Sequence, residues 1–255
     1  MSTALITGAT AGLGREFAEQ LASRGYDLVI VARDEERLAR ARDELVARYQ
    51  VAVEVLPADL SDRAATERVA QRVSDRERPV DLLVNNAGYG LATSFIDTDI
   101  EDEEDLLDVL VRAVLVLSHA AARAMATRGR GQIINVASVA AYLASGTYSA
   151  AKSWVVVFSE SLAGQLEGSG VGVSVVNPGF VRTEFHERAS INVGAREGTL
   201  WLDPISTVST ALADAKAGKV VSVPGLQYRA IVTVLRHLPR RIIRHPSVAG
   251  RRRAR

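Results

Sequence analysis

The stretch Thr7-Gly8-Ala9-Thr10-Ala11-Gly12-Leu13-Gly14 decides the fold, because it connects a short apolar run at residues 3–7 to a helical pattern at residues 14–24. Glycines between a strand and a helix let the backbone turn tightly and come close to a phosphate group. The N–H groups at the start of the helix then stabilise the phosphate charge. Taken alone, the same glycines are equally compatible with a tight connection that binds nothing.

The rest of the chain continues this alternation of strand and helix. Continuous apolar runs predict strands at residues 27–32, 51–56, 81–85, 133–136 and 171–176, with a short candidate at 220–223. Helical patterns occupy residues 34–49, 61–73, 103–128 and 148–167, and Ser61 is the expected cap of the second of these. Runs that are apolar throughout and separated by helices predict a parallel sheet covered on both faces. We therefore expect an α/β domain with a doubly wound, Rossmann-type sheet.

The composition indicates one soluble globular domain. The 255 residues show no internal repeat and no linker, so we expect a single domain at residues 1–225 and a basic C-terminal extension at residues 226–255. No run approaches the roughly 18 apolar residues of a membrane span. The absence of cysteine excludes disulfides and thiolate chemistry, and the four histidines have no metal-binding spacing, so no metal site is expected. No signal-peptide pattern is present, and the expected location is the cytoplasm.

The charge is distributed unevenly along the chain. Residues 215–255 carry a formal charge of +11 and no acidic side chain, so the remaining residues carry −10. Residues 226–245 combine arginines with apolar residues at helical spacing, interrupted by Pro239, and predict one or two short amphipathic helices. Either their apolar side packs on a substrate pocket or a partner subunit, or their basic side contacts an anionic membrane surface. Nucleic-acid binding is not expected, because the basic residues follow no known binding module.

Four further motifs follow the glycine turn in order. Asn85-Asn86-Ala87-Gly88 ends the fourth predicted strand, Ser138 follows the fifth, Tyr148-Ser149-Ala150-Ala151-Lys152 opens a helix, and Asn177-Pro178-Gly179 ends the sixth strand. Together with the G-x-x-x-G-x-G spacing of the turn, this order resembles the short-chain dehydrogenase/reductase family over about residues 3–225. The resemblance implies an oxidoreductase that uses a nicotinamide dinucleotide.

The resemblance also implies which residues contact the cofactor. They lie in the glycine turn and in the segments after the strands: Gly8, Thr10, Gly12, Leu13, Gly14, Arg33, Asp59, Leu60, Asn86, Ala87, Gly88, Tyr148, Lys152, Pro178, Gly179, Val181 and Thr183. Where NAD-binding members carry a carboxylate at the end of the second strand, this chain has Ala32 and then Arg33. A guanidinium can hold the extra phosphate of NADP, so we expect NADP(H), with NAD as the alternative. Asp34 argues for NAD, but its position is typical of a helix cap.

The catalytic residues implied by the family are Ser138, Tyr148 and Lys152. Tyr148 and Lys152 are four residues apart on a helix, and a nearby ammonium is expected to lower the pKa of a phenol. The resemblance implies that Ser138 holds the substrate oxygen, Tyr148 exchanges a proton with it as general acid/base, and Lys152 binds the nicotinamide ribose. We therefore expect an NADP(H)-dependent oxidoreductase acting on a carbonyl or alcohol of an apolar small molecule, in a homodimer or homotetramer.

One position departs from the family pattern. Leu110 stands where the resemblance places an asparagine that takes part in a water-mediated proton relay. Leucine cannot hydrogen-bond that water. The departure leaves open one alternative, a cofactor-binding sensor or scaffold with little turnover. A second alternative, a membrane-surface enzyme acting on lipid substrates, rests on the basic extension alone.

Overall fold

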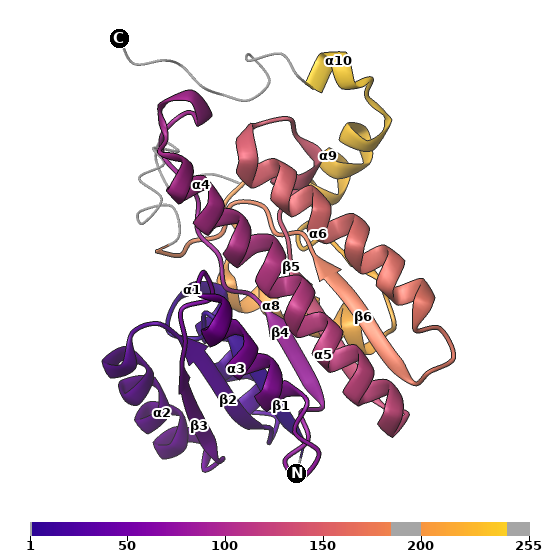
Figure 1. Ribbon diagram of the computed structural model, residues 1–255. Helices are drawn as coiled ribbons and strands as arrows, with labels where there is room; N and C mark the ends of the chain where they lie inside the picture. The colour runs from indigo at the N-terminus through magenta and orange to yellow at the C-terminus, as the bar shows by residue number, and fades with distance from the viewer. Residues whose placement is uncertain (1, 185–199, 244–255) are drawn as a thin grey trace.

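The computed structural model describes residues 2–184 and 200–243 and contains one parallel sheet with helices on both faces (Figure 1). The strands are β1 (Thr3–Thr7), β2 (Asp27–Ala32), β3 (Val53–Pro57), β4 (Leu82–Asn85), β5 (Gly131–Val136), β6 (Val171–Val176) and β7 (Val221–Ser222). Their order across the sheet is β3-β2-β1-β4-β5-β6-β7, and every neighbouring pair is parallel. The predicted doubly wound α/β sheet is confirmed.

The helices follow the predicted order. They are α1 (Gly12–Ala22), α2 (Glu35–Tyr49), α3 (Arg63–Val73), α4 (Ile100–Leu107), α5 (Ala113–Arg128), α6 (Gly146–Gln165), α8 (Pro204–Lys216), α9 (Leu226–His237) and α10 (Arg240–Ile243). A π-helical turn, η2 (Asp108–Arg112), joins α4 to α5, and short 3-10 turns form η1 (Phe95–Asp97) and η3 (Val139–Tyr142). The long helical segment therefore begins at Ile100, three residues before the predicted start.

The predicted cap of α3 was wrong by one residue. Asp62 is the cap, because its carboxylate accepts a hydrogen bond from the backbone N–H of Ala64 at 2.9 Å. Ser61 instead donates its hydroxyl to the Asp59 carboxylate at 3.0 Å. The side chain that caps a helix depends on this local competition between neighbouring polar groups, which the order of residues alone does not reveal.

The core is divided by the sheet into two layers. In β1, Ala4 and Ile6 belong to the cluster formed with α1, α2 and α8, whereas Leu5 belongs to the cluster formed with α3, α5 and α6. Successive residues of a strand point to opposite faces, so a strand with a helix layer on each side needs apolar residues throughout. This requirement explains the continuous apolar runs in the sequence.

One helical stretch among the described residues, Ile100–Arg128, is long and apolar enough to cross a membrane by length and composition alone. Its inner face, which includes Leu106, Leu110, Leu117 and Met125, is buried in the core cluster with α3 and the sheet. The core helix of a globular domain passes the same test of composition, so this stretch is weak evidence for a membrane span.

The C-terminal extension forms the two predicted helices, α9 and α10, with Pro239 between them. Tyr228 and Val232 on α9 are 4% exposed and pack with residues that follow β5 and β6. The apolar side of α9 therefore packs on the domain itself. The arginine-rich end of the extension, residues 244–255, lies outside the described residues.

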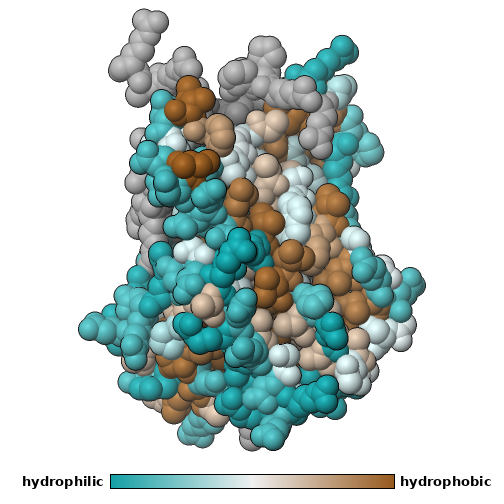
Figure 2. Space-filling model, in the orientation of Figure 1, coloured by the Kyte–Doolittle hydropathy of each residue, from teal (hydrophilic) through white to brown (hydrophobic). Residues whose placement is uncertain are grey.

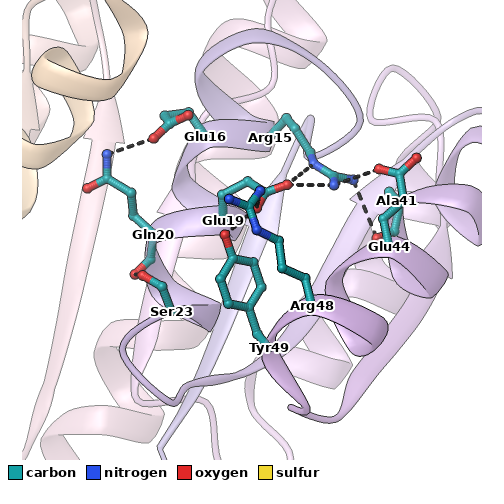
Figure 3. A network of polar contacts seen from close by, with 9 residues as sticks. All are labelled: Arg15, Glu16, Glu19, Gln20, Ser23, Ala41, Glu44, Arg48 and Tyr49. Carbon is teal, nitrogen blue, oxygen red and sulfur yellow. Dashed lines mark hydrogen bonds and ion pairs between the residues drawn. The ribbon is translucent and has the colours of Figure 1, made fainter.

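A polar network holds α1 against α2 (Figure 3). Glu19 accepts hydrogen bonds from Arg15 at 2.6 Å and from the hydroxyl of Tyr49 at 2.6 Å. Arg15 also reaches Glu44 at 2.7 Å, and Arg48 lies 3.4 Å from Glu19. Burial alone raises the pKa of Glu19, but the hydrogen bonds from Tyr49 and Arg15 outweigh it and leave the pKa below its usual value.

Replacing Tyr49 by Phe should lower the free energy of unfolding by about 1.5 kcal/mol at pH 7, because it removes a hydrogen bond to a charged carboxylate. The pKa of Glu19 is lowered in the fold, so this contribution is present above the ordinary carboxyl pKa and is lost as the pH falls through the lowered value. The same hydrogen bond raises the pKa of Tyr49, so the contribution is also lost when the pH rises well above 10. Urea unfolding of both proteins from about pH 3 to pH 9 measures the difference, and a difference independent of pH at the acid end would contradict this account.

Candidate active site

The segments after β1 and β4 are locked together at the C-terminal edge of the sheet. The hydroxyl of Thr7 accepts the backbone N–H groups of Asn86 and Ala87, both at 3.0 Å, and the Asn86 side chain donates to the Thr7 carbonyl at 2.9 Å. Gly8 has a φ of +69°, a value that favours glycine, and a Cβ there would lie 3.0 Å from Ala87. The Asn-Asn-Ala-Gly motif thus positions the glycine turn.

The start of α1 fits an anionic ligand. Its N-cap residue is Ala11, which has no side chain to bond the first N–H groups, whereas Asp34 and Asp62 cap α2 and α3. A Cβ on Gly14 would lie 2.1 Å from the carbonyl oxygen of Gly8, so the turn packs tightly under this helix end. An uncapped helix N-terminus beside a close-packed glycine turn can hold the pyrophosphate of a dinucleotide.

Ser138, Tyr148 and Lys152 come together where β5 ends. Ser138 directly precedes η3, its side chain hydrogen-bonds with the Tyr148 phenol, and its oxygen also accepts the N–H of Ala140 at 3.1 Å. The ammonium of Lys152 donates to the carbonyl of Val136 at 2.8 Å and lies 5.8 Å from the centre of the Tyr148 ring. Lys152 is 4% exposed. The four-residue spacing on α6 brings both side chains to one face, as predicted.

Burial sets the pKa values of this pair. It raises the pKa of Tyr148 to about 12, although the hydrogen bond with Ser138 acts in the opposite direction. It lowers the pKa of Lys152 to about 8. The pKa of the phenol is thus raised and not lowered as expected, because the loss of hydration outweighs the hydrogen bond with Ser138. At neutral pH, Tyr148 is a phenol and Lys152 is still mostly an ammonium.

Leu110 lies beside the same site. The Leu110 side chain is fully buried. A Cβ added to Gly88 would lie 2.8 Å from the Cδ2 atom of Leu110 and 3.6 Å from the Nζ atom of Lys152, so both side chains pack close to Gly88. Leu110 sits inside the π-helical turn η2, a type of irregularity that is frequent at functional sites. An apolar side chain therefore packs where the family pattern places an amide.

At the other end of the site, the segments after β2 and β3 face each other. The side chains of the exposed Arg33 and the half-buried Asp59 are 3.8 Å apart, and Asp59 also accepts a hydrogen bond from the N–H of Ser61 at 3.0 Å. The side chain of Leu60 is instead buried in the core. Arg37, which the sequence analysis missed, approaches the carbonyl of Thr10 in the glycine turn at 3.4 Å. Arg37 could have been noticed in the sequence, because it is a basic residue in the first turn of a predicted helix, where the helix dipole disfavours a positive charge.

The segment after β6 closes the site on its third side. A Cβ on Gly12 would lie 3.3 Å from the Cβ of Thr183, so this segment reaches the glycine turn. The carbonyl of Pro178 accepts the N–H of Val139 at 3.0 Å, and Val181 is buried in a cluster that also contacts Leu13. The predicted site residues of the strand ends thus form one continuous edge, with Leu60 and Val181 contributing side chains to the core.

Comparison with known proteins agrees with this geometry. The family model described as short chain dehydrogenase matches residues 2–193. Sulfoacetaldehyde reductase 2 of Chromohalobacter salexigens is 38% identical over 71% of this chain and 73% of its own length. The 3-oxoacyl-[acyl-carrier-protein] reductase of Escherichia coli is 35% identical over 71% of this chain and 74% of its own length. The chain belongs to the short-chain dehydrogenase/reductase family, whose members are oxidoreductases acting on alcohol and ketone groups.

Solved structures show the same fold. A short-chain dehydrogenase from Sphingobium yanoikuyae in complex with NADPH has a TM-score of 0.85 and 33% identity, with 100% of this chain and 98% of that chain covered. The bulky-bulky ketone specific alcohol dehydrogenase from Comamonas testosteroni has a TM-score of 0.80 and 26% identity, with 100% and 96% covered. A family member from Burkholderia phymatum, similar at a TM-score of 0.81, was solved in complex with NAD.

Replacing Gly14 by Ala should lower the free energy of unfolding by about 2 kcal/mol, because the added methyl group would overlap the Gly8 carbonyl oxygen and the Asn86 amide. Gly164 in α6 provides a matched control, since a Cβ there meets no atom within 4 Å. Gly164→Ala should leave stability unchanged or raise it by up to about 1 kcal/mol through helix propensity. Denaturant unfolding measures both variants, and equal effects of the two substitutions would contradict the close packing of the turn.

Proposed function

We propose that the protein is an NADP(H)-dependent reductase of carbonyl groups on apolar small molecules. The observation that carries this proposal is the meeting of Ser138, Tyr148 and Lys152 at the strand edge that also holds the uncapped start of α1. The side chains of Ser138, Tyr148 and Lys152 can act on a carbonyl oxygen, and the start of α1 can hold the pyrophosphate of a dinucleotide.

The three side chains divide the work at the substrate oxygen. Ser138 donates a hydrogen bond to the carbonyl oxygen, and Tyr148 donates its phenolic proton to that oxygen as the carbonyl is reduced. Lys152 is anchored on the Val136 carbonyl, and its remaining N–H groups would be available to the ribose next to the nicotinamide and to the phenol. The bound nicotinamide supplies the hydride, while the protein supplies orientation and proton transfer.

The pKa values favour the reductive direction at neutral pH. With a pKa of about 12, Tyr148 holds the proton that reduction consumes, whereas oxidation of an alcohol needs the phenolate. Lys152 keeps its charge up to a pH of about 8, so its ammonium form is present where Tyr148 acts as an acid. Reduction therefore needs no prior ionisation of either residue at neutral pH.

Two arginines support a preference for NADP(H). Arg33 directly follows β2, and in this type of fold the ribose of the adenosine lies at the end of that strand. Arg37 contacts the carbonyl of Thr10 in the glycine turn. A guanidinium can bind a phosphate through two N–H groups at once, whereas the acidic Asp59 is held by Ser61 and faces Arg33. The NADPH complex of the Sphingobium neighbour supports this choice, and the NAD complex of the Burkholderia neighbour keeps NAD as the alternative.

The other interpretations have less support. A sensor with little turnover rests on Leu110 alone, and the similar proteins of stated activity are reductases and dehydrogenases. The packing of Tyr228 and Val232 on the domain argues against contact of the extension with a membrane. Location in the cytoplasm stays a prediction.

Self-association through the outer faces of α5 and α6 is the favoured form of assembly. Leu115 and Val157 are 44% and 63% exposed, and the stacked rings of Trp154 and Phe158 lie 4.7 Å apart on α6. Figure 2 shows apolar side chains gathered over this part of the molecule, bordered by polar ones. Such a patch is typical of a subunit interface and is consistent with a homodimer or homotetramer. A monomer in sedimentation equilibrium at micromolar concentration would contradict it.

Replacing Tyr148 by Phe should lower kcat for NADPH-dependent ketone reduction at least about 100-fold, because the general acid is removed, while NADPH binding is retained.

In the wild-type protein, kcat/KM for reduction should fall as the pH rises through about 8, where Lys152 loses its charge, and alcohol oxidation should instead increase with pH. Steady-state rates over a pH series measure both trends. A fully active Tyr148→Phe variant would contradict the assigned role, and Tyr49→Phe, far from the site, serves as the control.

The substitutions Arg33→Ala and Arg37→Ala should each raise the Kd of NADPH about tenfold or more, because each substitution removes a charged hydrogen-bond donor to the adenosine phosphate. The Kd of NADH, which lacks that phosphate, should change by less than about twofold. Titration of cofactor fluorescence measures both constants without any substrate. An equal loss of affinity for the two cofactors would mean that the arginines act on the glycine turn itself and not on the phosphate.

A further inference from the structure

Tyr228 links the C-terminal extension to the segment after β6. Its hydroxyl accepts the backbone N–H of Phe180 at 2.9 Å and donates to the carbonyl of Leu200 at 2.8 Å. One phenol therefore satisfies a backbone group on each side of the stretch 185–199. A buried tyrosine with both its donor and its acceptor used at backbone atoms defines the separation of those two atoms.

The ring of Tyr228 is fixed as firmly as its hydroxyl. A Cβ on Gly179 would lie 1.9 Å from the ring carbon that bears the hydroxyl, so the ring lies directly against the backbone of the Asn-Pro-Gly motif. The ring also packs in a cluster with Val139, Val181 and Val232, and Val139 directly follows Ser138. The absence of a side chain at residue 179 is thus a condition for the packing of Tyr228.

The backbone held by Tyr228 forms a small paired structure. Leu202 donates to the Phe180 carbonyl at 2.8 Å, and Arg182 donates to the Leu202 carbonyl at 3.1 Å, which makes a parallel bridge between Val181 and Leu202. The rings of Phe180 and Trp201 lie 5.6 Å apart. These contacts join residues 180–182 and 200–202 to Tyr228 as one packed unit.

This unit carries exposed apolar side chains next to the catalytic edge. Phe180 is 40% exposed and Leu200 is 45% exposed, and Phe180 follows Gly179 at the end of β6. Exposed large apolar residues at the edge of a site offer contact area to an apolar ligand. Their backbone positions are set by the Tyr228 hydroxyl, which lies on a different element.

We propose that Tyr228 is a positioning residue that holds Phe180 and Leu200 as an apolar wall for bulky, apolar carbonyl substrates. The C-terminal extension then determines substrate size preference without touching the reacting atoms. This inference rests on the proposed reductase activity. It extends that activity by a substrate class and by a residue outside the motifs of the family.

The test compares Tyr228→Phe with Tyr49→Phe, which also loses one tyrosine hydroxyl but lies in the α1–α2 network. Each full-length variant is assayed with NADPH on an aryl ketone, acetophenone, and on a small polar aldehyde, glycolaldehyde. Tyr228→Phe removes the hydrogen bonds to both Phe180 and Leu200, and it should raise KM for acetophenone at least about fivefold, with kcat changed less than twofold. KM for glycolaldehyde and the Kd of NADPH should stay within twofold, and Tyr49→Phe should change none of these constants. Equal changes in KM for the two carbonyls, or a change in kcat alone, would overturn the proposal.

Amide hydrogen exchange of the wild-type protein tests the contact without any variant. The Phe180 N–H should exchange slowly, because it is bonded to a buried hydroxyl. Exchange at the rate of an unprotected amide would overturn the proposal even if Tyr228→Phe failed to fold. Absence of turnover by the wild-type protein on both carbonyls would contradict the proposed reductase instead, and the exchange rate of Phe180 would then decide the contact by itself.

Discussion

The structure depends on the close packing of the glycine turn beneath the segment that follows β4. The Thr7 hydroxyl takes two backbone N–H groups from that segment, and there is no room for a side chain at Gly14. These contacts fix the start of α1 against the central strands, and the α1–α2 network around Glu19 holds the helix from its other side. Because parallel strands end at one edge, a turn fixed there brings the helix end proposed to hold the cofactor phosphates close to the side chains after β5 and at the start of α6.

At this edge, burial and not ion pairing sets the pKa values of Tyr148 and Lys152, two of the proposed catalytic residues. The phenol of Tyr148 lies in a site that raises its pKa to about 12, and the neighbouring Lys152 has its pKa lowered to about 8. Burial thereby keeps Tyr148 in the protonated form that the proposed reduction of a carbonyl requires, and the lowered pKa of Lys152 still leaves that residue mostly charged at neutral pH. The apolar Leu110 beside Gly88 and Lys152 contributes to this low-polarity environment. In the proposed reaction, the burial that keeps Tyr148 protonated favours reduction of the carbonyl, and oxidation of an alcohol requires a higher pH.

The parts of the fold that were predictable from the sequence are those encoded by neighbouring residues. The strand at Val171–Val176 and the glycine turn follow from local apolar runs and local spacing, and the four motifs indicated the family. The cap of α3 required a choice between Ser61 and Asp62 that depends on the position of Asp59. The raised pKa of Tyr148 depends on the packing of several elements around it, and the Tyr228 contacts join residues 48 apart in the chain. No local pattern contains such information, although the apolar spacing of Tyr228 and Val232 does indicate the buried side of α9.

The central claim is that a hydride is transferred from NADPH to a carbonyl carbon at this edge of the sheet. Transfer of an isotope from the cofactor to the product tests this claim most directly. Wild-type protein is incubated with a ketone and with NADPH that carries deuterium at one or the other of the two C4 positions, and the alcohol is analysed by mass spectrometry and NMR. The account predicts that deuterium from one of the two labelled cofactors appears on the carbinol carbon of the product. Alcohol formed without deuterium from either cofactor, or no alcohol from any ketone in a broad panel, would contradict it.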